Sequence, residues 1–377
     1  MRVCVIRNAD TSTNSNMMRA ALAIHEGQNE VIFLSRNRKA HERKGFKKDT
    51  IDIQGQTFVD YTIQMNGKMG QGIKNLTNVF RYEFEVFKWL RKNRKLFDYI
   101  HVFDLDAGLP VMLFAKLFRK KYIYHIADFY ADSKDGIPRR LYGMVKKAEF
   151  SVIDHAEATI ICLEKRKEQI QGSHPKNLVV VHNTPVMSCI PQSDSKKIPG
   201  KLHVCYTGNL AKRRFVDKLL DLAENDKNVI LDVAGLGEEE IEKRCEKLAK
   251  SNENIHYYGY VKYEEAVKLG ASADVIAAIY DPNIKNHKYS APNKVYEAIM
   301  MNKPILVARN SGIDELVEKE KIGYIADYDI ESVKKLIEEL KQKPDFSDIE
   351  KHCKEAYKTY CWKEMKKRIQ NIYQELD

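Results

Sequence analysis

Short apolar runs alternate along the chain with segments whose apolar residues recur at helical spacing. The runs of the first half include MRVCVI at 1–6, EVIFLSR at 30–36, KYIYHIADF at 121–129 and LVVVHN at 178–183. Between them lie helix-like segments, such as MMRAALAIHEG at 17–27 and GLPVMLFAKLFRK at 108–120. This alternation predicts βαβ units that build a parallel sheet.

The alternation stops at NTPVMSCIPQSDSKKIPGK, residues 183–201, which holds three prolines and many small polar residues. It then restarts, with helix-like segments at 216–225 and 238–250 and strand-like runs at 229–235 and 304–308. We therefore predict an α/β protein of two doubly wound Rossmann-like domains facing across a cleft. The predicted parts are a domain at 1–182, a linker at 183–200, a domain at 201–358, and a C-terminal helix at 359–377 that packs back towards the first domain. Ligands of such sheets bind outside the carboxyl ends of the strands.

Composition narrows the class of protein. The chain has 377 residues, of which 44% are apolar and 31% charged, as in a globular protein. Its seven cysteines are scattered and form no CxxC pair, which argues against a disulfide framework and a zinc site. The first residues lack the apolar core of a secretory signal, and no stretch approaches the ~18 apolar residues of a spanning helix. We expect a cytoplasmic protein that meets a membrane, if at all, at the inner face of the plasma membrane.

The positive charge is confined to the first half. Residues 1–190 carry a net charge of +11 and residues 191–377 a net charge of −1, which gives the total of +10. Such asymmetry predicts an anionic partner for the first half: lipid headgroups, nucleic acid or an acidic substrate. Basic and aromatic residues mix in the segment 80–97, and basic residues recur at 116–122 and 138–147. The segment 80–97 could lie on anionic headgroups or bury its aromatic rings in the core, and we expect each to hold in part.

The most informative stretch is KYSAPNKVYEAIMMNKPIL, residues 288–306. Pro292 suits the first turn of a helix, Ser290 is placed to cap it, and Asn302 suits a left-handed stop. Free N–H groups at a helix start can hold a phosphate, and the carboxylate of Glu297 should lean back towards that end. Glu297 could then accept hydrogen bonds from ribose hydroxyls, or it could be a surface glutamate on an amphipathic helix.

Three further loops follow predicted strands. In YTGNLAKRRF, residues 206–215, a strand ends at Gly208 and the cluster Lys212, Arg213 and Arg214 suits a diphosphate, although a solvated basic turn has the same sequence. In VAGLG, residues 233–237, Gly235 and Gly237 give a weak phosphate-loop signal. In HYYGYV, residues 256–261, backbone groups near Val261 could read a base edge, or the segment could be an ordinary βα turn.

In this order and spacing, the four loops resemble the nucleotide-binding half of family-4 glycosyltransferases of the GT-B fold, of the type found in bacterial polysaccharide biosynthesis. The resemblance is close over most of 200–320, and the S-x-P-N-K-x-x-E pattern looks like the donor motif of that family. Its residues here are Ser290, Pro292, Asn293, Lys294 and Glu297. The resemblance implies that Arg214 contacts the donor diphosphate, that Glu297 holds the ribose and that backbone near Val261 meets the base.

This chain departs from the family pattern at two positions. Tyr289 stands where the family has an earlier acid that contacts the donor sugar, which leaves the sugar and the stereochemistry open. Asn209 stands where the family often has an arginine, so that Lys212, Arg213 and Arg214 are left to supply the positive charge.

The first half offers acceptor-side candidates at two predicted strand ends. One strand ends in Asp104 and Asp106, and another in His125 and Asp128. A carboxylate or imidazole there could take the proton of an acceptor hydroxyl, with Asp128 the first candidate and Asp106 the second. His125 could instead be a packed, hydrogen-bonded histidine. The DxD pattern of Asp104 and Asp106 could bind a metal, but the resemblance implies neither a metal nor another cofactor. The two aspartates could instead contact the acceptor or cap the next helix.

The resemblance implies a hexosyltransferase that moves a sugar from a nucleotide-diphosphate sugar to an acceptor, with retention of configuration. A lipid-linked glycan of capsule, exopolysaccharide or wall-polymer assembly is the acceptor it suggests. One alternative is a nucleotide-sugar epimerase of the same form, which would need further acid and base groups but no acceptor. A nucleic-acid-binding protein that uses the basic first half is another, yet the sequence shows no recognition helix or stacking module for it, so we expect no nucleic-acid partner.

Overall fold

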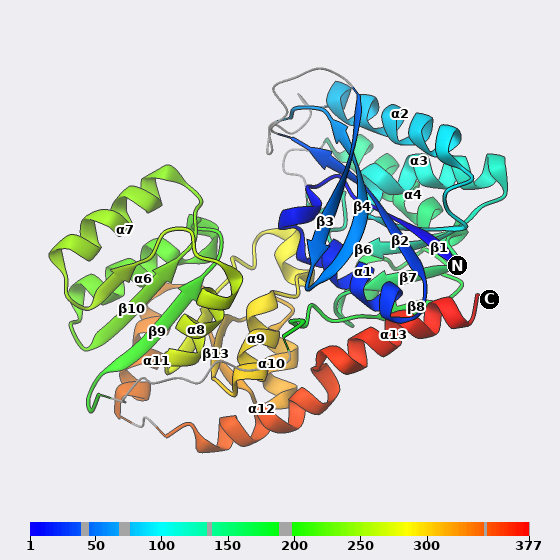
Figure 1. The fold of residues 1–377 in the computed structure, drawn as a ribbon. Helices are drawn as coiled ribbons and strands as arrows, with labels where there is room; N and C mark the ends of the chain where they lie inside the picture. Colours follow the sequence, from blue (N-terminus) through cyan, green and yellow to red (C-terminus); the bar gives the residue numbers. More distant parts are fainter. Residues whose placement is uncertain (39–44, 68–75, 134–137, 188–197, 343–344, 377) are drawn as a thin grey trace. The chain divides into compact units, whose positions relative to one another are not determined.

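The computed structural model describes residues 1–38, 45–67, 76–133, 138–187, 198–342 and 345–376 (Figure 1). The chain folds as two compact units. The first comprises Met1–Val181 with Met365–Asp377, and the second comprises His182–Glu364. The predicted linker at 183–200 begins the second unit, and its residues 188–197, which include Cys189, lie outside the described residues.

The first unit is built on an eight-stranded sheet with the order β3-β4-β2-β1-β5-β6-β7-β8. Its strands are β1 (Arg2–Ile6), β2 (Glu30–Asn37), β3 (Phe46–Ile53), β4 (Gln56–Gln64), β5 (Tyr99–Phe103), β6 (Lys121–Ile126), β7 (Ala158–Ile161) and β8 (Leu178–Val180). All neighbours pair in parallel except β3 and β4. The all-parallel prediction is therefore wrong at this edge. Gln54 and Gly55 both have positive φ, which suits the tight turn of an antiparallel hairpin.

Helices cover both faces of this sheet (Figure 1). Those of the first unit are α1 (Ser15–Glu26), α2 (Leu76–Asn93), α3 (Asp104–Phe118), α4 (Arg139–His155), α5 (Arg166–Gln169) and, from Met365 on, α13 (Trp362–Gln374), with the 3-10 helix η1 (Thr11–Thr13). α3 packs between α2 and α4, and their apolar faces meet one face of the sheet in a shared core. α13 lies against α1, where the Gln370 amide donates to the Ala23 carbonyl at 3.1 Å.

The second unit has a six-stranded parallel sheet with the order β11-β10-β9-β12-β13-β14. Its strands are β9 (Leu202–Thr207), β10 (Val229–Ala234), β11 (Ile255–Tyr257), β12 (Val275–Ala278), β13 (Ile305–Ala308) and β14 (Gly323–Ala326). Its helices are α6 (Val216–Asn225), α7 (Glu239–Ser251), α8 (Tyr263–Ser272), α9 (Asn293–Met301), α10 (Asp314–Glu320), α11 (Ile330–Gln342) and α12 (Ser347–Tyr360), with the 3-10 helices η3 (Lys212–Arg214) and η4 (Lys285–Tyr289). α6, α7 and α11 share a core with one face of the sheet, and α12 packs on α9.

These two sheets confirm the predicted α/β class with doubly wound, Rossmann-like topology. Three element boundaries were predicted wrongly. α3 begins at Asp104 rather than Gly108, the C-terminal tail breaks at Cys361 into α12 and α13, and the segment after α10 contains the unpredicted β14 and α11.

Each sheet has one point where the strand order reverses. In the first unit the chain moves outward from β1 in one direction and from β5 in the other, and in the second unit the same holds for β9 and β12. The loops after two such neighbouring strands diverge and leave room for a ligand. Candidate chemistry should therefore lie after β9 and β12, and after β1 and β5.

Candidate active site

The reversal point of the second unit gathers the strongest sequence candidates. The loop after β9 runs into η3 and carries Arg214, and the segment after β12 carries Tyr280. The next helix, α9, contributes Lys294 and Glu297. Three separate stretches of sequence thus bring a cation, an aromatic ring and an ion pair to one edge of the sheet.

Helix α9 is held by its apolar residues and by its neighbours. Residues 295–301 are all buried. The Asn183 amide donates to the Ala291 carbonyl at 2.8 Å, and the Tyr296 hydroxyl bonds His182 Nδ1 at 3.0 Å. Asn302 ends the helix in the left-handed conformation with φ 55°, which confirms the predicted stop.

The predicted cap of α9 is wrong. Pro292 occupies the N-cap position, one residue before the predicted place, and no side chain caps the helix. The Ser290 hydroxyl donates instead to the His287 carbonyl at 3.0 Å. The first N–H groups of α9 therefore have no side-chain cap, which leaves them able to bind an anion.

Glu297 is only 3% exposed, although it carries a charge. Lys294 Nζ lies 2.7 Å from Glu297 Oε2, so the two charges compensate each other. Burial lowers the pKa of Lys294, but the Glu297 carboxylate more than offsets this and leaves that pKa raised. Within the described residues Oε1 of Glu297 makes no hydrogen bond, so it can accept one from a ligand.

The three basic residues of the loop after β9, Lys212, Arg213 and Arg214, lie in different environments. Lys212 Nζ pairs with Glu240 Oε2 of α7 at 2.8 Å, and both side chains are largely exposed. Arg213 is exposed, and its carbonyl accepts from the Asp281 N–H at 3.1 Å. Arg214 is half-buried with its guanidinium carbon 3.7 Å from the centre of the Tyr280 ring. Of the three, Arg214 is the cation placed beside the Tyr280 ring.

The glycine-rich loops have a packing explanation. Gly208 N–H donates to the Ala234 carbonyl at 2.9 Å, and a Cβ on Gly235 would lie 1.8 Å from the Gly208 carbonyl oxygen. Gly235 also has φ 139°, a conformation that favours glycine. Asn209 is exposed, and its carbonyl accepts from the Tyr206 hydroxyl at 2.6 Å. Gly235 is thus required by the close approach of two loops, and its role towards a phosphate stays a prediction.

The remaining donor-side candidates lie around the same edge of the sheet. Val261 is half-buried and comes just before α8, and the Gly259 carbonyl of its loop accepts from Gly235 N–H at 2.7 Å. Tyr289 ends η4 and is half-buried, and Asn293 begins α9. Their roles towards a base and a sugar stay predictions.

The reversal point of the first unit is organised around Asp104. This buried carboxylate accepts from the N–H groups of Ala127 and Asp128, each at 2.9 Å, and from Arg7 Nε at 3.1 Å. Burial raises its pKa to about 6, although Arg7 acts in the opposite direction. Asp104 also has φ 58°, a strained conformation that is enriched at functional sites.

The three acceptor-side candidates differ in accessibility. The Asp128 side chain is 55% exposed and lies 3.9 Å from Arg7, whereas half-buried Asp106 accepts from the Asn8 amide at 2.6 Å. His125 is buried, with Nδ1 3.1 Å from His101 Nε2, and burial holds its pKa well below the usual value. Of the two hypotheses for His125, the structure favours the packed, hydrogen-bonded histidine.

The comparison with protein families concerns the second unit. Residues 191–359 match the model of the family "Glycosyl transferases group 1". The chain carries a group 1 glycosyltransferase domain. This confirms that the protein is a glycosyltransferase, and it confirms the predicted resemblance. A comparison with curated proteins gave no match.

Solved structures share the fold of this glycosyltransferase over its whole length. Sucrose-phosphate synthase from Thermosynechococcus elongatus is similar with a TM-score of 0.74 and 14% identity, covering 100% of this chain and 99% of that one. HepE from Anabaena, in complex with UDP and glucose, is similar with a TM-score of 0.66, 14% identity and coverage of 100% and 99%. WaaG, a glycosyltransferase of lipopolysaccharide biosynthesis, gives a TM-score of 0.66, 14% identity and coverage of 98% and 99%. The glycosyltransferase therefore has the GT-B fold.

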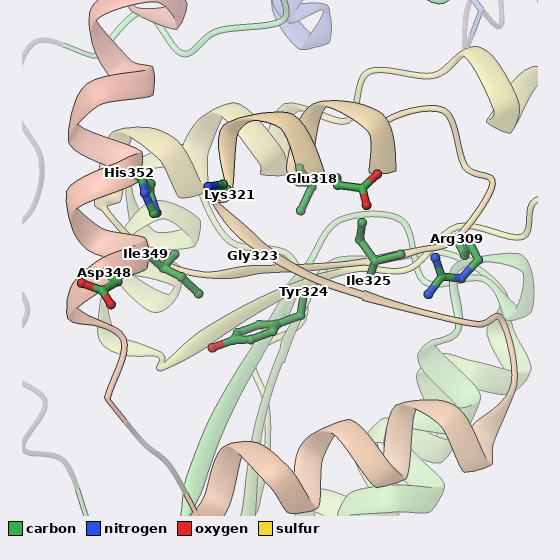
Figure 2. A pocket seen from close by; sticks show the side chains of 10 residues that line it. Arg309, Glu318, Lys321, Gly323, Tyr324, Ile325, Asp348, Ile349 and His352 are labelled. Atoms are coloured by element: carbon green, nitrogen blue, oxygen red, sulfur yellow. The ribbon is translucent and has the colours of Figure 1, made fainter.

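A hollow of about 450 Å³ lies elsewhere in the glycosyltransferase, beside the edge strand β14 (Figure 2). Figure 2 shows charged side chains of both signs around it, contributed by α10, β14, α12 and the end of β13. Arg309 there pairs with Asp327 at 2.9 Å, and Asp348 pairs with Lys351 at 3.2 Å. It contains none of the candidate residues, and we assign it no role.

Sequence reasoning missed several residues of these sites. Arg7 and Asn8 follow β1, and Tyr280 follows β12, so all three stand at strand ends beside a reversal point. The rule that ligands bind outside the carboxyl ends of strands would have found them, had the strand order been known. A tyrosine after an apolar run is also typical of core packing, so the local sequence gives Tyr280 no distinct functional signal.

Proposed function

We propose that this glycosyltransferase transfers a sugar from a nucleoside-diphosphate sugar to a lipid-linked glycan, with retention of configuration. The observation that carries the proposal is the group formed by Arg214, Tyr280, Lys294 and Glu297 at the reversal point of the second sheet. Among the described residues, the cation Arg214 forms no salt bridge and one oxygen of the Glu297 carboxylate accepts no hydrogen bond, which suits a diphosphate and a ribose.

On the donor side, Arg214 and the start of α9 supply positive charge and N–H donors for the diphosphate. Glu297 Oε1 accepts a hydrogen bond from the ribose, while the contact of Lys294 with Oε2 orients the carboxylate. Backbone near Val261 meets the base. HepE, which shares the fold, is described with UDP and glucose, and this supports a nucleotide sugar as donor.

On the acceptor side, we assign the proton-accepting role to Asp128 because its carboxylate is exposed and Arg7 keeps a positive charge nearby. Asp106 is the second candidate, since Asn8 fixes one of its oxygens. Asp104 positions the loop that carries Asp128 through its two backbone hydrogen bonds. His125 is left out because its ring is buried and bonded to His101. The proposal includes no metal, and activity that persists in excess EDTA would support this.

The lipid-linked acceptor is supported by the surface of α2, α3 and α4. Exposed apolar side chains lie one turn apart on α2 (Phe80 and Phe84) and on α3 (Leu113 and Leu117), and Met144 is exposed on α4. Exposed cations on the same helices are Arg81, Lys88, Arg91, Lys92, Lys116, Arg139, Arg140 and Lys147. Apolar side chains among cations suit the surface of an anionic bilayer. WaaG, a glycosyltransferase involved in lipopolysaccharide biosynthesis, shares the fold. None of the helices in the described part of the chain has the length and apolar character that crossing a membrane requires.

The donor assignment is tested by a thermal-shift panel of UDP, GDP, TDP and ADP with their sugars. We expect one base family to raise the melting temperature. Glu297→Gln should weaken that binding about tenfold or more, because it removes a charge-assisted hydrogen bond. Glu246→Gln, the same change on the exposed surface of α7, is the control and should bind as the wild type does. Unchanged nucleotide binding in both Glu297→Gln and Arg214→Ala would show that the site is wrong.

A further inference from the structure

Arg214 lies over one aromatic ring. Its guanidinium carbon is 3.7 Å from the centre of the Tyr280 ring, whereas the contacts of Lys218 with Phe215 and Tyr328 measure 4.8 and 4.9 Å. A guanidinium at this distance from a tyrosine ring is held by dispersion and by the negative face of the ring. The contact joins the loop after β9 to the segment after β12, the two sides of the reversal point.

The backbone next to this contact is fixed as well. The Asp281 N–H donates to the Arg213 carbonyl at 3.1 Å, so the residues beside Arg214 and Tyr280 are tied together. Phe215, the next residue after Arg214, is fully buried and has φ 64°, a strained conformation for a bulky side chain. Because the Phe215 ring also packs against Tyr328, the loop cannot relax without losing a core contact.

Arg214 has no acidic partner in the part of the chain that the structure describes. Among the described residues it forms no salt bridge, and its Nε is buried without a hydrogen-bond partner. The neighbouring cations differ in this respect, since Lys212 pairs with Glu240 and Lys294 with Glu297. A half-buried guanidinium with an aromatic ring and no acidic partner is suited to receive an anion.

The Tyr280 ring also contacts a neutral group. The ring of His287 is tilted by 46° against the Tyr280 ring at 5.2 Å between centres, and His287 Nδ1 bonds the Asp281 carbonyl at 2.9 Å. Burial, assisted by the charge of Arg214, lowers the pKa of His287 to about 4. His287 is therefore uncharged at neutral pH, and it supports the ring without competing for the anion.

From this geometry we propose that Tyr280 is a positioning residue that holds the Arg214 guanidinium ready for the donor diphosphate. The inference rests on the proposed function and adds a residue to it. The guanidinium is kept in place before the nucleotide arrives, so that less rotamer freedom is lost on binding. Since Tyr280 acts through Arg214, its removal should weaken recognition of phosphates and leave recognition of the nucleoside unchanged.

The test compares Tyr280→Leu, which removes the ring, with Tyr280→Phe, which keeps the ring and removes the hydroxyl. Calorimetry would measure the binding of the nucleoside diphosphate preferred by the wild type and, at millimolar concentration, of the matching nucleoside. We expect Tyr280→Leu to bind the diphosphate about tenfold more weakly. It should bind the nucleoside as the wild type does, and Tyr280→Phe should match the wild type for both.

Two further variants keep the test decisive if Tyr280→Leu folds poorly. Tyr280→Met fills a similar volume without a ring and should show the same selective loss. In an Arg214→Ala background the change Tyr280→Leu should cause no further loss of diphosphate affinity, because the two residues act as one unit.

Each outcome separates the two proposals. Wild-type diphosphate affinity in Tyr280→Leu and Tyr280→Met, or an equal loss of nucleoside affinity, would overturn the positioning role and leave the proposed function intact. If the wild type binds no nucleoside diphosphate, the proposed function fails and this inference fails with it.

Discussion

Glu149 is a fully buried acid that forms no salt bridge among the described residues. Its Oε1 accepts from the Tyr124 hydroxyl at 2.9 Å, and its Oε2 accepts from the Tyr130 N–H at 3.0 Å. Burial raises its pKa from an ordinary value of 4.5 to about 8. At neutral pH the folded protein therefore holds Glu149 as the neutral acid, whereas the unfolded chain ionises it.

This difference makes stability depend on pH. Because the folded pKa lies above the unfolded one, the contribution of Glu149 is complete below pH 4.5 and is lost as pH rises towards about 8. Glu149→Gln should remove this dependence, since an amide can accept from the Tyr130 N–H and donate to the Tyr124 oxygen. Between these two pH values, the free energy of unfolding of the wild type should fall by about 1.4 kcal/mol per pH unit relative to that of the variant.

Urea unfolding at several pH values measures the effect. The control is Glu168→Gln on the exposed surface of α5, which should keep the pH dependence of the wild type. Parallel pH profiles of wild type and Glu149→Gln would mean that the buried acid stays ionised in the folded protein.

At the scale of elements, two loops of the second unit meet so closely that glycine is required. A Cβ on Gly235 would lie 1.8 Å from the Gly208 carbonyl oxygen, and φ at this residue is 139°. Gly235→Ala should therefore destabilise the protein by about 3 kcal/mol or more, since backbone atoms must move and the new residue is strained.

The matched control is Gly143→Ala in α4, where nothing lies within 4 Å of the added methyl group. That change should leave stability equal or raise it by up to about 1 kcal/mol, because alanine favours a helix. Urea midpoints of the full chain report both effects. A Gly235→Ala variant as stable as the wild type would show that the two loops can separate at little cost.

The elements that the sequence predicted well are those whose buried residues form a regular pattern along the chain. The continuous apolar runs of β9 and β13 follow from burial on both sheet faces, and α6 follows from one apolar stripe. The strand β3 was missed because FKKDTIDI is largely polar and exposed at the sheet edge. The strand β14 was missed because, unlike the equally short β13, it is only half-buried over GYI and so has no continuous apolar run.

The only parts of the candidate site that the sequence could predict are residues that belong to a recognisable sequence motif. Glu297 was found from its motif, but the Lys294 partner that permits its burial depends on a helical turn and on packing that sequence does not disclose. Tyr280 and Arg214 are 66 positions apart. Their contact follows only from the adjacency of β9 and β12, which local sequence patterns do not encode.

At the scale of the whole molecule, charge is distributed unevenly between the two halves of the sequence. The net +11 of residues 1–190 is expressed partly on α2, where Arg81, Lys88 and Arg91 are exposed beside Phe80 and Phe84. Other aromatic side chains of this helix, Tyr82 and Trp89, are buried in the core. The burial hypothesis therefore holds for Tyr82 and Trp89, whereas Phe80 and Phe84 are exposed, and contact of this helix with anionic headgroups stays a prediction.

We expect the protein to sediment with vesicles that contain phosphatidylserine and to stay free of vesicles of phosphatidylcholine alone. The triple variant Arg81→Glu, Lys88→Glu and Arg91→Glu should lose this binding by about 100-fold or more, because each cation near an anionic surface contributes on the order of 1 kcal/mol. The matched control reverses the charge of three exposed lysines of α7: Lys243→Glu, Lys247→Glu and Lys250→Glu. These lysines belong to the second unit, so their replacement should leave vesicle binding unchanged. Raising the salt concentration should weaken vesicle binding by the wild type, because salt screens the attraction between the cations and the headgroups. The vesicle binding that remains at high salt should come from apolar contact, so the double variant Phe80→Ser with Phe84→Ser should weaken it. If the α2 and α7 variants lost vesicle binding equally, net charge alone would be responsible, and the helical surface would have no specific role.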